Sequence, residues 1–375
     1  MHYTMKRGGA YDRFRIMLDA FLERGCEVHC LSLTPIPVNH PSYHNHVITF
    51  PFGTGNRFVA RLVTLLLFPL YGLIMGWREK IDLCVAFGPL YAFLQSVPRL
   101  ILGKPMVTLI RVDLSLSSKG WAWRNPRTLI DQAMEYVALL FSDRIITTNT
   151  TIREEILRIS QKWKKIEVEV LYNNIPPVRK SGANDVSRVR AEFGIPEQGR
   201  MMVTGGVMTP RKNFETLIRS LSGLGRQDVF LVISGDSSSG GGDHYCRFLK
   251  DLIRKLDLGN KVILTGWVEK EELWRIFSAA DLFVLPSLKE GMPNVLLEAL
   301  GCNIPCFGSN IPGIRDILSH DFLMFDPHDD EVLAKKLAHF FSDEDYRKKI
   351  AHLCFGQTEK FRFDWKERVF AAVTR

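Results

Sequence analysis

Short apolar runs alternate with longer amphipathic stretches along the whole chain. In the N-terminal half the apolar runs predict seven strands: His2–Met5, Glu27–Leu31, His46–Phe50, Leu83–Phe87, Met106–Ile110, Arg144–Thr147 and Val168–Tyr172. Helical stretches separate most of them, and Ala10–Glu23 and Arg127–Phe141 are two examples. Alternating strands and helices are typical of βαβ units, which build parallel sheets covered by helices.

The second half of the chain restarts the same pattern. Five strands are expected: Arg200–Thr204, Val229–Ser234, Lys261–Thr265, Leu282–Leu285 and Pro305–Gly308. Five helices are expected: Phe214–Leu224, His244–Leu256, Lys270–Ala279, Pro293–Leu300 and Asp330–Ser342. The pattern therefore predicts an α/β protein with two doubly wound, Rossmann-like domains.

A polar segment with two prolines separates the two halves. Pro176 and Pro177 precede the run Ser181–Asp185, and this composition is typical of a connector. We expect an N-terminal domain over residues 1–175, a linker over 176–195 and a C-terminal domain over 196–355. Two such domains facing each other would form a central cleft, because ligands of doubly wound sheets bind beyond the carboxyl ends of the strands.

Composition and charge add a candidate partner to this picture. The chain has 375 residues, of which 46% are hydrophobic and 24% charged, as in ordinary globular proteins of two domains. The net charge of +8 is uneven, because residues 1–175 carry 21 lysines and arginines against 14 acidic residues. A basic N-terminal half favours an anionic partner such as a membrane surface, and a solvated basic face is the alternative.

One uncharged stretch bears on membrane association. Leu62–Trp77 is 16 residues long and contains Pro69, Gly72 and Gly76, whereas a membrane span needs about 20 apolar residues. We therefore predict a buried or interfacial helix. The first residues lack the long apolar region of a signal peptide. These features favour a cytoplasmic protein that associates peripherally with the inner face of the cytoplasmic membrane, and a core helix is the alternative.

The cysteines and histidines give no metal signature. Seven cysteines are scattered, and Cys302 and Cys306 lie in an apolar setting that indicates buried thiols. This usage is typical of a reducing compartment. His40, His44 and His46 would need a carboxylate or a cysteine beside them to hold a metal, and none accompanies them in the sequence. A loop leading into a strand explains these histidines.

Two glutamates frame the start of a short apolar helix. Glu290 follows the strand Leu282–Leu285 in a polar loop, at a carboxyl end where ligands bind. Glu298 is the only charge on the helix, and a lone buried carboxylate is costly unless it finds donors such as ribose hydroxyls. Asn294 suits the N-cap, and the amides of Asn294 and Val295 would receive a diphosphate. A salt-bridged structural glutamate is the alternative.

Two further clusters lie at predicted strand-to-helix turns. Arg211 and Lys212 follow the strand over residues 200–204 and would neutralise a phosphate or a departing diphosphate, although adjacent basic residues also form solvated turns. Gly8 and Gly9 follow the first strand and would let the backbone approach a phosphate at a helix start. The third glycine of the dinucleotide fingerprint is missing there.

The segment from Val203 to Leu318 resembles the family 4 retaining glycosyltransferases of GT-B fold, within the glycosyl transferases group 1. The resemblance is carried by Gly205…Lys212-Asn213, Leu231…Gly235-Asp236, Val262…Val268, Ala280…Ser287, Glu290…Leu300 and Gly308…Gly313. The N-terminal half matches more loosely, at Gly8-Gly9, Ser142–Ile146 and Val170–Asn174. The tail around Phe361–Trp365 resembles the closing helix, expected over 356–375, that crosses back to the N-terminal domain.

The resemblance implies roles for the matched positions. Glu290 would contact the donor sugar, Glu298 the ribose and Lys212 the distal phosphates. The backbone at Val268 would lie by the base, and Gly9 would approach the diphosphate. Gly235 lies in the matched donor-binding stretch.

This sequence departs from the family at two places. The family has a sugar-facing residue, often His, after an N-domain strand, where this chain has Arg111 and Asp113, so one of these would serve. An Arg directly after the loop glycine is absent, and Arg211 would substitute for it. Trp121 and Trp123 would either stack on an acceptor sugar or anchor a loop.

Together these features predict a glycosyltransferase, and the resemblance implies that it retains the anomeric configuration. It would move a hexosyl-type sugar from a nucleotide-sugar donor to a glycan or lipid-linked saccharide, in cell-surface polysaccharide or glycolipid biosynthesis. Lys212, Arg211 and helix amides would stabilise the leaving diphosphate, so no metal or other cofactor is expected. A nucleotide-linked epimerase or oxidoreductase and a non-catalytic nucleotide-binding protein are the alternatives. Nucleic acid is not expected as a partner, because the basic residues lack interleaved aromatic side chains.

Overall fold

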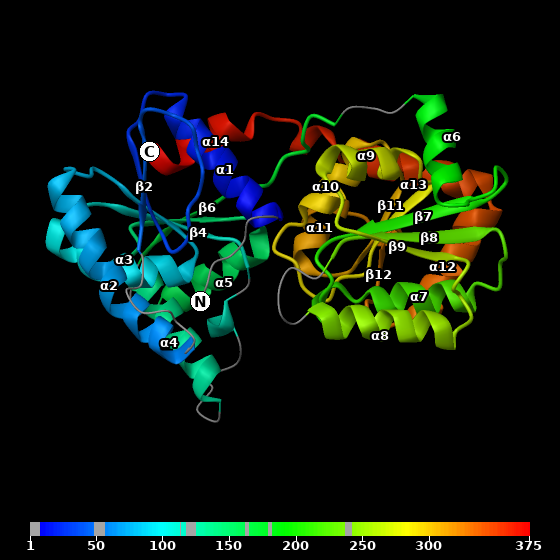
Figure 1. Cartoon of the computed structure of the whole chain (residues 1–375), viewed down its shortest axis with the longest axis horizontal. Coiled ribbons are helices and arrows are strands. Elements are labelled where there is room, and N and C mark those ends of the chain that lie inside the picture. Colours follow the sequence, from blue (N-terminus) through cyan, green and yellow to red (C-terminus); the bar gives the residue numbers. More distant parts are fainter. Residues whose placement is uncertain are drawn as a thin grey trace. The chain divides into compact units, whose positions relative to one another are not determined.

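The computed structural model describes residues 8–48, 57–112, 114–117, 125–161, 165–178, 182–236 and 242–375. The chain divides into two compact units (Figure 1). Unit 1 consists of residues 1–172 and 364–375, and unit 2 of residues 173–363. Each unit has parallel sheets covered by helices, so the predicted α/β class with two Rossmann-like domains is confirmed.

Unit 1 contains two separate parallel sheets. Its helices are α1 (Gly9–Leu22), α2 (Arg57–Arg78), α3 (Pro89–Leu102), α4 (Pro126–Phe141), α5 (Thr150–Ser160) and α14 (Trp365–Thr374), with a 3-10 turn η1 (Ser115–Ser117). Its strands are β1 (Val28–Ser32), β2 (Tyr43–Val47), β3 (Cys84–Phe87), β4 (Met106–Ile110), β5 (Arg144–Thr147) and β6 (Glu167–Val170). β1 pairs with β2, and β3 to β6 form a four-stranded sheet in chain order.

The core of unit 1 is centred on β4, which is buried along its whole length. Strands of parallel sheets have both faces covered and therefore read as continuous apolar runs. Ile110 and Ile145 pack with Leu139 of α4 and Ile152 of α5 in one cluster. The neighbouring apolar residues of β4 and β5 are the signal by which both strands were predicted to the residue.

Unit 2 is built on a single six-stranded parallel sheet. Its strands are β7 (Arg200–Gly205), β8 (Val229–Ser234), β9 (Val262–Gly266), β10 (Leu282–Leu285), β11 (Cys306–Ser309) and β12 (Met324–Phe325). Its helices are α6 (Ala183–Glu192), α7 (Phe214–Gly223), α8 (Gly242–Lys255), α9 (Lys270–Ser278), α10 (Asn294–Gly301), α11 (Pro312–Leu318), α12 (Asp330–Ser342) and α13 (Glu344–Gly356). Three 3-10 turns complete it: η2 (Pro210–Lys212), η3 (Asp321–Leu323) and η4 (Glu359–Phe361).

The strand order of unit 2 indicates where along the edge of the sheet a ligand would bind. The order is β12-β11-β10-β7-β8-β9, so the chain turns back between the neighbours β7 and β10. Figure 1 shows α7 and α8 on one face of this sheet and α9 and α10 on the other. In open α/β sheets the crevice at such a reversal, beyond the carboxyl ends of the strands, is where ligands bind.

The boundaries between the units differ from those expected from the sequence. Unit 2 begins at Asn173, before the expected linker, and α6 occupies part of segment 176–195. Arg190 of α6 donates to the Ala279 carbonyl and forms an ion pair of 2.8 Å with Asp281, which attaches α6 to unit 2. Residues 356–363, expected in the closing helix, also belong to unit 2.

The end of the chain returns to unit 1 as helix α14, which packs on α1. The ring of Phe370 lies 5.1 Å from that of Phe21, and the Arg24 guanidinium stacks on Phe370 at 4.8 Å. The Trp365 indole donates a hydrogen bond of 3.1 Å to the Tyr172 carbonyl. Aromatic contacts therefore bury one face of α14 against the first helix of the same unit.

Two strand predictions need comment. The strand expected at His2–Met5 lies outside the described residues. The strand expected at His46–Phe50 is instead β2, Tyr43–Val47, in register with β1. The Asn45 amide donates to the Cys30 carbonyl, and its side-chain oxygen accepts from the Ile36 amide, so specific hydrogen bonds place polar residues in this strand. The remaining predicted strands agree with the structure to within two residues at each end.

Helix α2 contains the uncharged stretch Leu62–Trp77. None of the helices in the described parts of the chain has the length and hydropathy needed to cross a membrane. Its glycines face α3: a Cβ at Gly72 would lie 2.7 Å from Gln95 Oε1, and one at Gly76 would lie 2.4 Å from Leu102 Cδ1. The two helices therefore pack closely through the α2 glycines, and the opposite side of α2 is exposed.

Candidate active site

The candidate site lies at the carboxyl ends of β7 and β10, the neighbouring strands where the sheet order reverses. The loop after β7 leads through η2 into α7, and the loop after β10 leads into α10. The Leu288 amide donates to the Arg211 carbonyl at 2.8 Å, which ties one loop to the other. The sheet topology thus brings together two segments that are far apart in the sequence.

Glu290 is at the centre of this site and is clamped by two cations. Its side chain is buried, and the Lys212 ammonium donates to Oε1 at 2.7 Å. The Arg211 guanidinium donates to Oε2 at 3.0 Å and to the Lys289 carbonyl at 2.6 Å. The Ser287 hydroxyl donates to Oε1 at 2.9 Å. The structure therefore joins Glu290, Lys212 and Arg211 into one cluster.

The electrostatics of this cluster keep Glu290 ionised. Burial alone raises the pKa of Glu290, because the charged form loses its hydration. The positive charges of Lys212 and Arg211 and the hydrogen bonds from Lys212 and Ser287 outweigh burial and hold the pKa of Glu290 below its ordinary value. Two cations facing one carboxylate leave an excess positive charge, which suits an anionic ligand.

Glycines shape the floor of the site. Gly206 has φ of 142°, and a Cβ there would lie 2.8 Å from Lys212 Cε. Gly235, after β8, has φ of 153°, and a Cβ there would lie 1.9 Å from the Gly206 carbonyl oxygen. Only glycine fits such a close backbone approach. The missing side chain of Gly206 therefore leaves room for the Lys212 side chain. The missing side chain of Gly235 lets the Gly206 backbone take its position.

Asn213 holds η2 in place and takes a left-handed conformation with φ of 54°. Its side-chain amide donates to the carbonyls of Pro286 at 3.0 Å and Pro327 at 2.8 Å. Its oxygen accepts from the Thr216 hydroxyl at 2.9 Å. Asn213 therefore fixes the turn that presents Arg211 and Lys212 to the end of β10.

Helix α10 is buried, as its apolar sequence predicts. Glu298 is 7% exposed and is the one charged residue among the eight of α10. The expected cap is wrong in detail: Pro293 is the N-cap, without a side-chain cap bond, and Asn294 is the first helical residue. Pro293 has an extended backbone with φ of −74°, which its ring favours. Val295 lies near the end of β7, since a Cβ at Gly205 would be 3.5 Å from its Cγ2.

The loop carrying Glu290 is braced from two sides. A Cβ at Gly313, in the first turn of α11, would lie 2.5 Å from the Glu290 carbonyl oxygen and 2.1 Å from that of Gly291. The buried Asn173 side chain donates to the Met292 carbonyl at 3.0 Å. Close packing and a buried hydrogen bond therefore fix the loop backbone on which Glu290 stands.

Sequence reasoning missed three hydroxyl groups near these strand ends. Ser287 donates to Glu290, and its position two residues after the end of β10 was the available signal. Thr209, just before η2, and Ser234, the last residue of β8, have buried hydroxyls without a hydrogen-bond partner within the described structure. Buried polar groups are rarely left unpaired, so these two hydroxyls are exceptions close to the candidate site.

The other unit 2 candidates lie at neighbouring positions of the same sheet edge. Val268 follows β9 and is half-buried, and Gly235 follows β8. The Gly235 amide donates to the Gly266 carbonyl at 2.9 Å, so the ends of β8 and β9 are linked beyond the ladder. Cys302 and Cys306 are buried free thiols, as expected.

The unit 1 candidates are only partly visible. Gly8 is the N-cap of α1 with φ of 108°, and Gly9 is the first residue of the helix. Arg111 follows β4, and its guanidinium lies over the Phe87 ring at 5.5 Å. Asp113, Trp121 and Trp123 lie outside the described residues.

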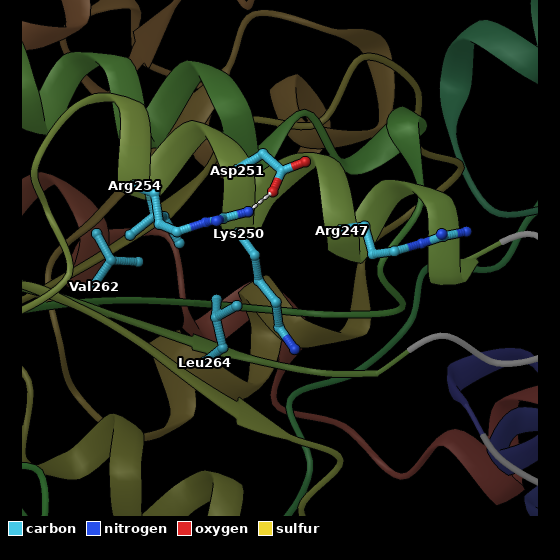
Figure 2. Close-up of a pocket in the computed structure, with 7 residues that line it drawn as sticks. Arg247, Lys250, Asp251, Arg254, Val262 and Leu264 are labelled. Atoms are coloured by element: carbon cyan, nitrogen blue, oxygen red, sulfur yellow. Dashed lines mark hydrogen bonds and ion pairs between the residues drawn. The ribbon is translucent and has the colours of Figure 1, made fainter.

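A separate basic pocket of about 550 Å³ lies between α8 and the edge strand β9 (Figure 2). It is lined by Arg247, Lys250, Asp251, Ile253, Arg254, Val262 and Leu264. Asp251 is paired with Arg254, which reduces the net charge of the pocket. The pocket shares no residue with the Glu290 cluster. It is therefore a second basic site on unit 2 that could compete with the candidate site for an anion.

Comparisons with known proteins relate the chain to glycosyltransferases. Residues 185–352 match the family model of glycosyl transferases group 1. The chain is 29% identical over 227 residues to an uncharacterized glycosyltransferase of Methanocaldococcus jannaschii. That alignment covers 59% of this chain and 56% of the relative, so the chain spans little more than half of the relative's length.

Solved structures match both units. The chain superposes on Anabaena HepE in complex with UDP and glucose with a TM-score of 0.77 and 18% identity, over 98% of this chain and 96% of HepE. It superposes on WaaG, a glycosyltransferase involved in lipopolysaccharide biosynthesis, with a TM-score of 0.74 and 18% identity, over 98% and 96% of the two chains. At this identity the likeness establishes the fold, which is GT-B. The family match and the fold together support a glycosyltransferase.

Proposed function

We propose that the chain is a retaining glycosyltransferase of family 4 that moves a hexosyl group from a nucleotide-sugar donor to a saccharide acceptor. The observation that carries this proposal is the cluster of Glu290, Lys212 and Arg211 at the reversal point of the unit 2 sheet. A buried carboxylate held by two cations is costly to fold, so a ligand role is the better explanation than stability.

The chemistry follows from the charges. Breaking the bond between the anomeric carbon and the diphosphate leaves an extra negative charge on the departing nucleotide. Lys212 and Arg211 face this charge, and the positive end of the α10 helix dipole, beside the end of β7, favours an anion. Charge stabilisation that is already in position lowers the barrier most in a water-poor site. Glu290 orients both cations and contacts the sugar, and Glu298 accepts from ribose hydroxyls.

We propose a uridine diphosphate hexose as the donor to test first. HepE, which has the same fold, was solved with UDP and glucose. The reaction is metal-independent, because two side-chain cations and the helix amides supply the charge that a divalent ion would otherwise provide. Chelation should therefore leave the rate of transfer unchanged.

We propose that the acceptor is a lipid-linked saccharide at an anionic membrane surface, as in cell-surface polysaccharide or glycolipid biosynthesis on the cytoplasmic side. The carrying observation is an exposed apolar stripe on α2. Its members recur every three or four residues and are Leu66 at 65%, Leu70 at 49%, Ile74 at 52% and Trp77 at 79% exposure.

The α2 stripe continues onto the neighbouring helix and has basic residues at its end. On α3, Val97, Leu100 and Ile101 are exposed, and α2 and α3 pack together. Arg78 and Lys80 are exposed directly after Trp77. Apolar side chains with a basic border suit insertion among anionic head groups, where each cation contributes about 1 kcal/mol.

The test of the donor site is a screen for nucleotide release. Purified protein is incubated with UDP-, GDP- and ADP-hexoses, and the released nucleotide is measured with and without acceptor lipid extract. We expect turnover with one donor class, and a severe loss in the variants Glu290→Ala, Glu298→Ala and Lys212→Ala. Lys289→Ala, which removes an exposed lysine beside Glu290, is the matched control and should keep its rate. Wild-type turnover in all three site variants would refute the assignment.

A further inference from the structure

Four titratable side chains of unit 1 meet on one face of the β1–β2 pair. The strands are parallel, with His29 opposite His44 and Leu31 opposite His46. Alternate residues of a strand point to the same face, so Glu27 shares a face with His29, and His44 shares one with His46. In the sequence Glu27 and His29 lie 15 residues or more before His44 and His46, which hides the cluster. The expectation that no carboxylate accompanies these histidines was therefore wrong.

Three of these side chains present their ligand atoms to a common point. Glu27 Oε1 lies 3.4 Å from His29 Nε2 and 3.1 Å from His44 Nε2, and all three atoms lie within 4.8 Å of one another. The His29 side chain is 6% exposed, whereas those of His44 and Glu27 are 41% and 65% exposed. One ligand is thus fixed in the protein, and two remain open to entry from solvent.

These distances fit a transition metal. Zn²⁺ binds His nitrogen and carboxylate oxygen at about 2.0–2.2 Å, so two ligands of one tetrahedral ion lie about 3.4 Å apart. The distances from Glu27 Oε1 to His29 Nε2 and His44 Nε2, 3.4 and 3.1 Å, match this spacing. Two His ligands and one carboxylate also leave the fourth position to water, as in open zinc sites.

A fourth side chain orients the buried ligand. His29 Nδ1 lies 3.0 Å from His46 Nε2. When His29 Nε2 faces an ion, the Nδ1 proton can be donated to His46, which fixes the ring and its tautomer. The His29 ring stacks with those of His44 at 4.7 Å and His46 at 5.2 Å, so its orientation is also set by packing.

We infer that Glu27, His29 and His44 form a Zn²⁺ site, with His46 as the partner that orients His29. The bound ion joins the edge strand β2 to β1 and stabilises unit 1. This site is independent of the proposed transfer reaction, since it shares no residue with the Glu290 cluster.

The test is metal binding by the full, tag-free chain after treatment with chelator. Zn²⁺ is titrated by calorimetry, and Co²⁺ is added as a probe, because its visible absorption reports tetrahedral coordination. We expect one ion per chain, a rise in the melting temperature with Zn²⁺ and unchanged transfer activity in chelator. No uptake of Zn²⁺ at this stoichiometry would overturn the inference.

Variants separate this site from non-specific binding. His44→Gln and Glu27→Gln change exposed side chains and should leave the fold intact by circular dichroism, and each should weaken Zn²⁺ binding at least tenfold. His46→Gln should weaken it by about 10–100-fold while one ion still binds. His40→Gln changes a histidine of the same segment outside the cluster and should bind as the wild type does. Equal affinity in all four variants, or an equal loss in His40→Gln, would place the ion elsewhere.

Discussion

The two units use the same parallel α/β construction but place their unusual residues in opposite environments. In unit 2 the unusual residues are charged and buried: Lys212 and Glu290 have side chains 8% and 9% exposed and pair at 2.7 Å. In unit 1 they are apolar and exposed, with Leu66 and Trp77 of α2 at 65% and 79%. Each arrangement lowers the stability of its unit. Each is explained by a binding partner: an anion for the buried charges and a lipid surface for the exposed apolar side chains.

This contrast suggests a division of roles between the units. A buried ion pair contributes little net stability, because desolvation offsets most of the attraction, but it provides fixed charge for an anion such as a diphosphate. Exposed apolar stripes are unfavourable in water but insert readily at a lipid interface. We therefore propose that the donor chemistry belongs to unit 2 and the recognition of a lipid-linked acceptor to unit 1.

The largest effect is expected from variants of the Lys212–Glu290 ion pair. They distinguish its contribution to stability from its contribution to turnover. Glu290→Gln or Lys212→Met alone leaves a buried charge with one fewer partner, so each should cost up to about 3–5 kcal/mol of unfolding free energy. The double variant Lys212→Met/Glu290→Gln should recover most of that loss in urea unfolding. Turnover should stay about 100-fold or more below wild type in all three. A double variant that regains its turnover together with its stability would show that the pair is only structural.

A second test compares two glycines with the same strain and different neighbours. Gly206 and Gly88 have φ of 142° and 117°, so alanine should cost about 1–3 kcal/mol of stability at either position. A Cβ at Gly206 would displace Lys212, whereas one at Gly88 meets nothing within 4 Å. We therefore expect Gly206→Ala to lose at least tenfold more turnover than Gly88→Ala. Equal losses would mean that the position of Lys212 does not matter for the reaction.

A third test concerns the exposed apolar side chains. Replacing Leu66, Leu70, Ile74 and Trp77 with serine should reduce binding to anionic liposomes at least tenfold in a sedimentation assay, because each buried apolar side chain contributes about 1 kcal/mol or more. The matched control replaces exposed apolar residues of unit 2, namely Phe248, Phe322 and Val332. Donor hydrolysis should be unaffected in both. If the unit 2 control loses as much binding, the α2 stripe is not the docking surface.

The smallest effect expected is on acid stability. The folded pKa of Glu290 lies below its ordinary value of 4.5, so its contribution to stability is present above that pH and is lost as the pH falls through the folded pKa. Between pH 6 and the most acid pH at which the chain stays folded, wild type should therefore lose more unfolding free energy than Glu290→Gln. Parallel pH profiles for the two proteins would contradict the pairing.

The fold was predictable where adjacent apolar residues mark a buried strand. β4, β5, β8 and β10 match the expected strands to the residue, and each contains neighbouring apolar residues, as buried parallel strands do. β2 was misplaced because side-chain hydrogen bonds of Asn45 determine its position, and no periodicity shows them. The segment expected as a linker was misread because α6 is polar in sequence and is held to unit 2 by Arg190.

The sequence predicted which residues belong to the candidate site, but not which of them contact one another. Each turn showed a residue type suited to an anion, but the strand order that brings Arg211 and Lys212 onto Glu290 arises from long-range pairing of β7 with β10. For the same reason the cluster of Glu27, His29 and His44 was invisible, since only the parallel register of β1 and β2 assembles it. Contacts across strands depend on topology, which local patterns do not encode.

The measurement that tests the central claim most directly is a crystal structure with bound UDP. We predict that the diphosphate lies within hydrogen-bonding distance of the Lys212 ammonium and the first-turn amides of α10, with the ribose at Glu298. The basic pocket of Arg247, Lys250 and Arg254 is the competing anion site on the same unit (Figure 2). A diphosphate found in that pocket, with the Lys212–Glu290 pair untouched, would contradict the account.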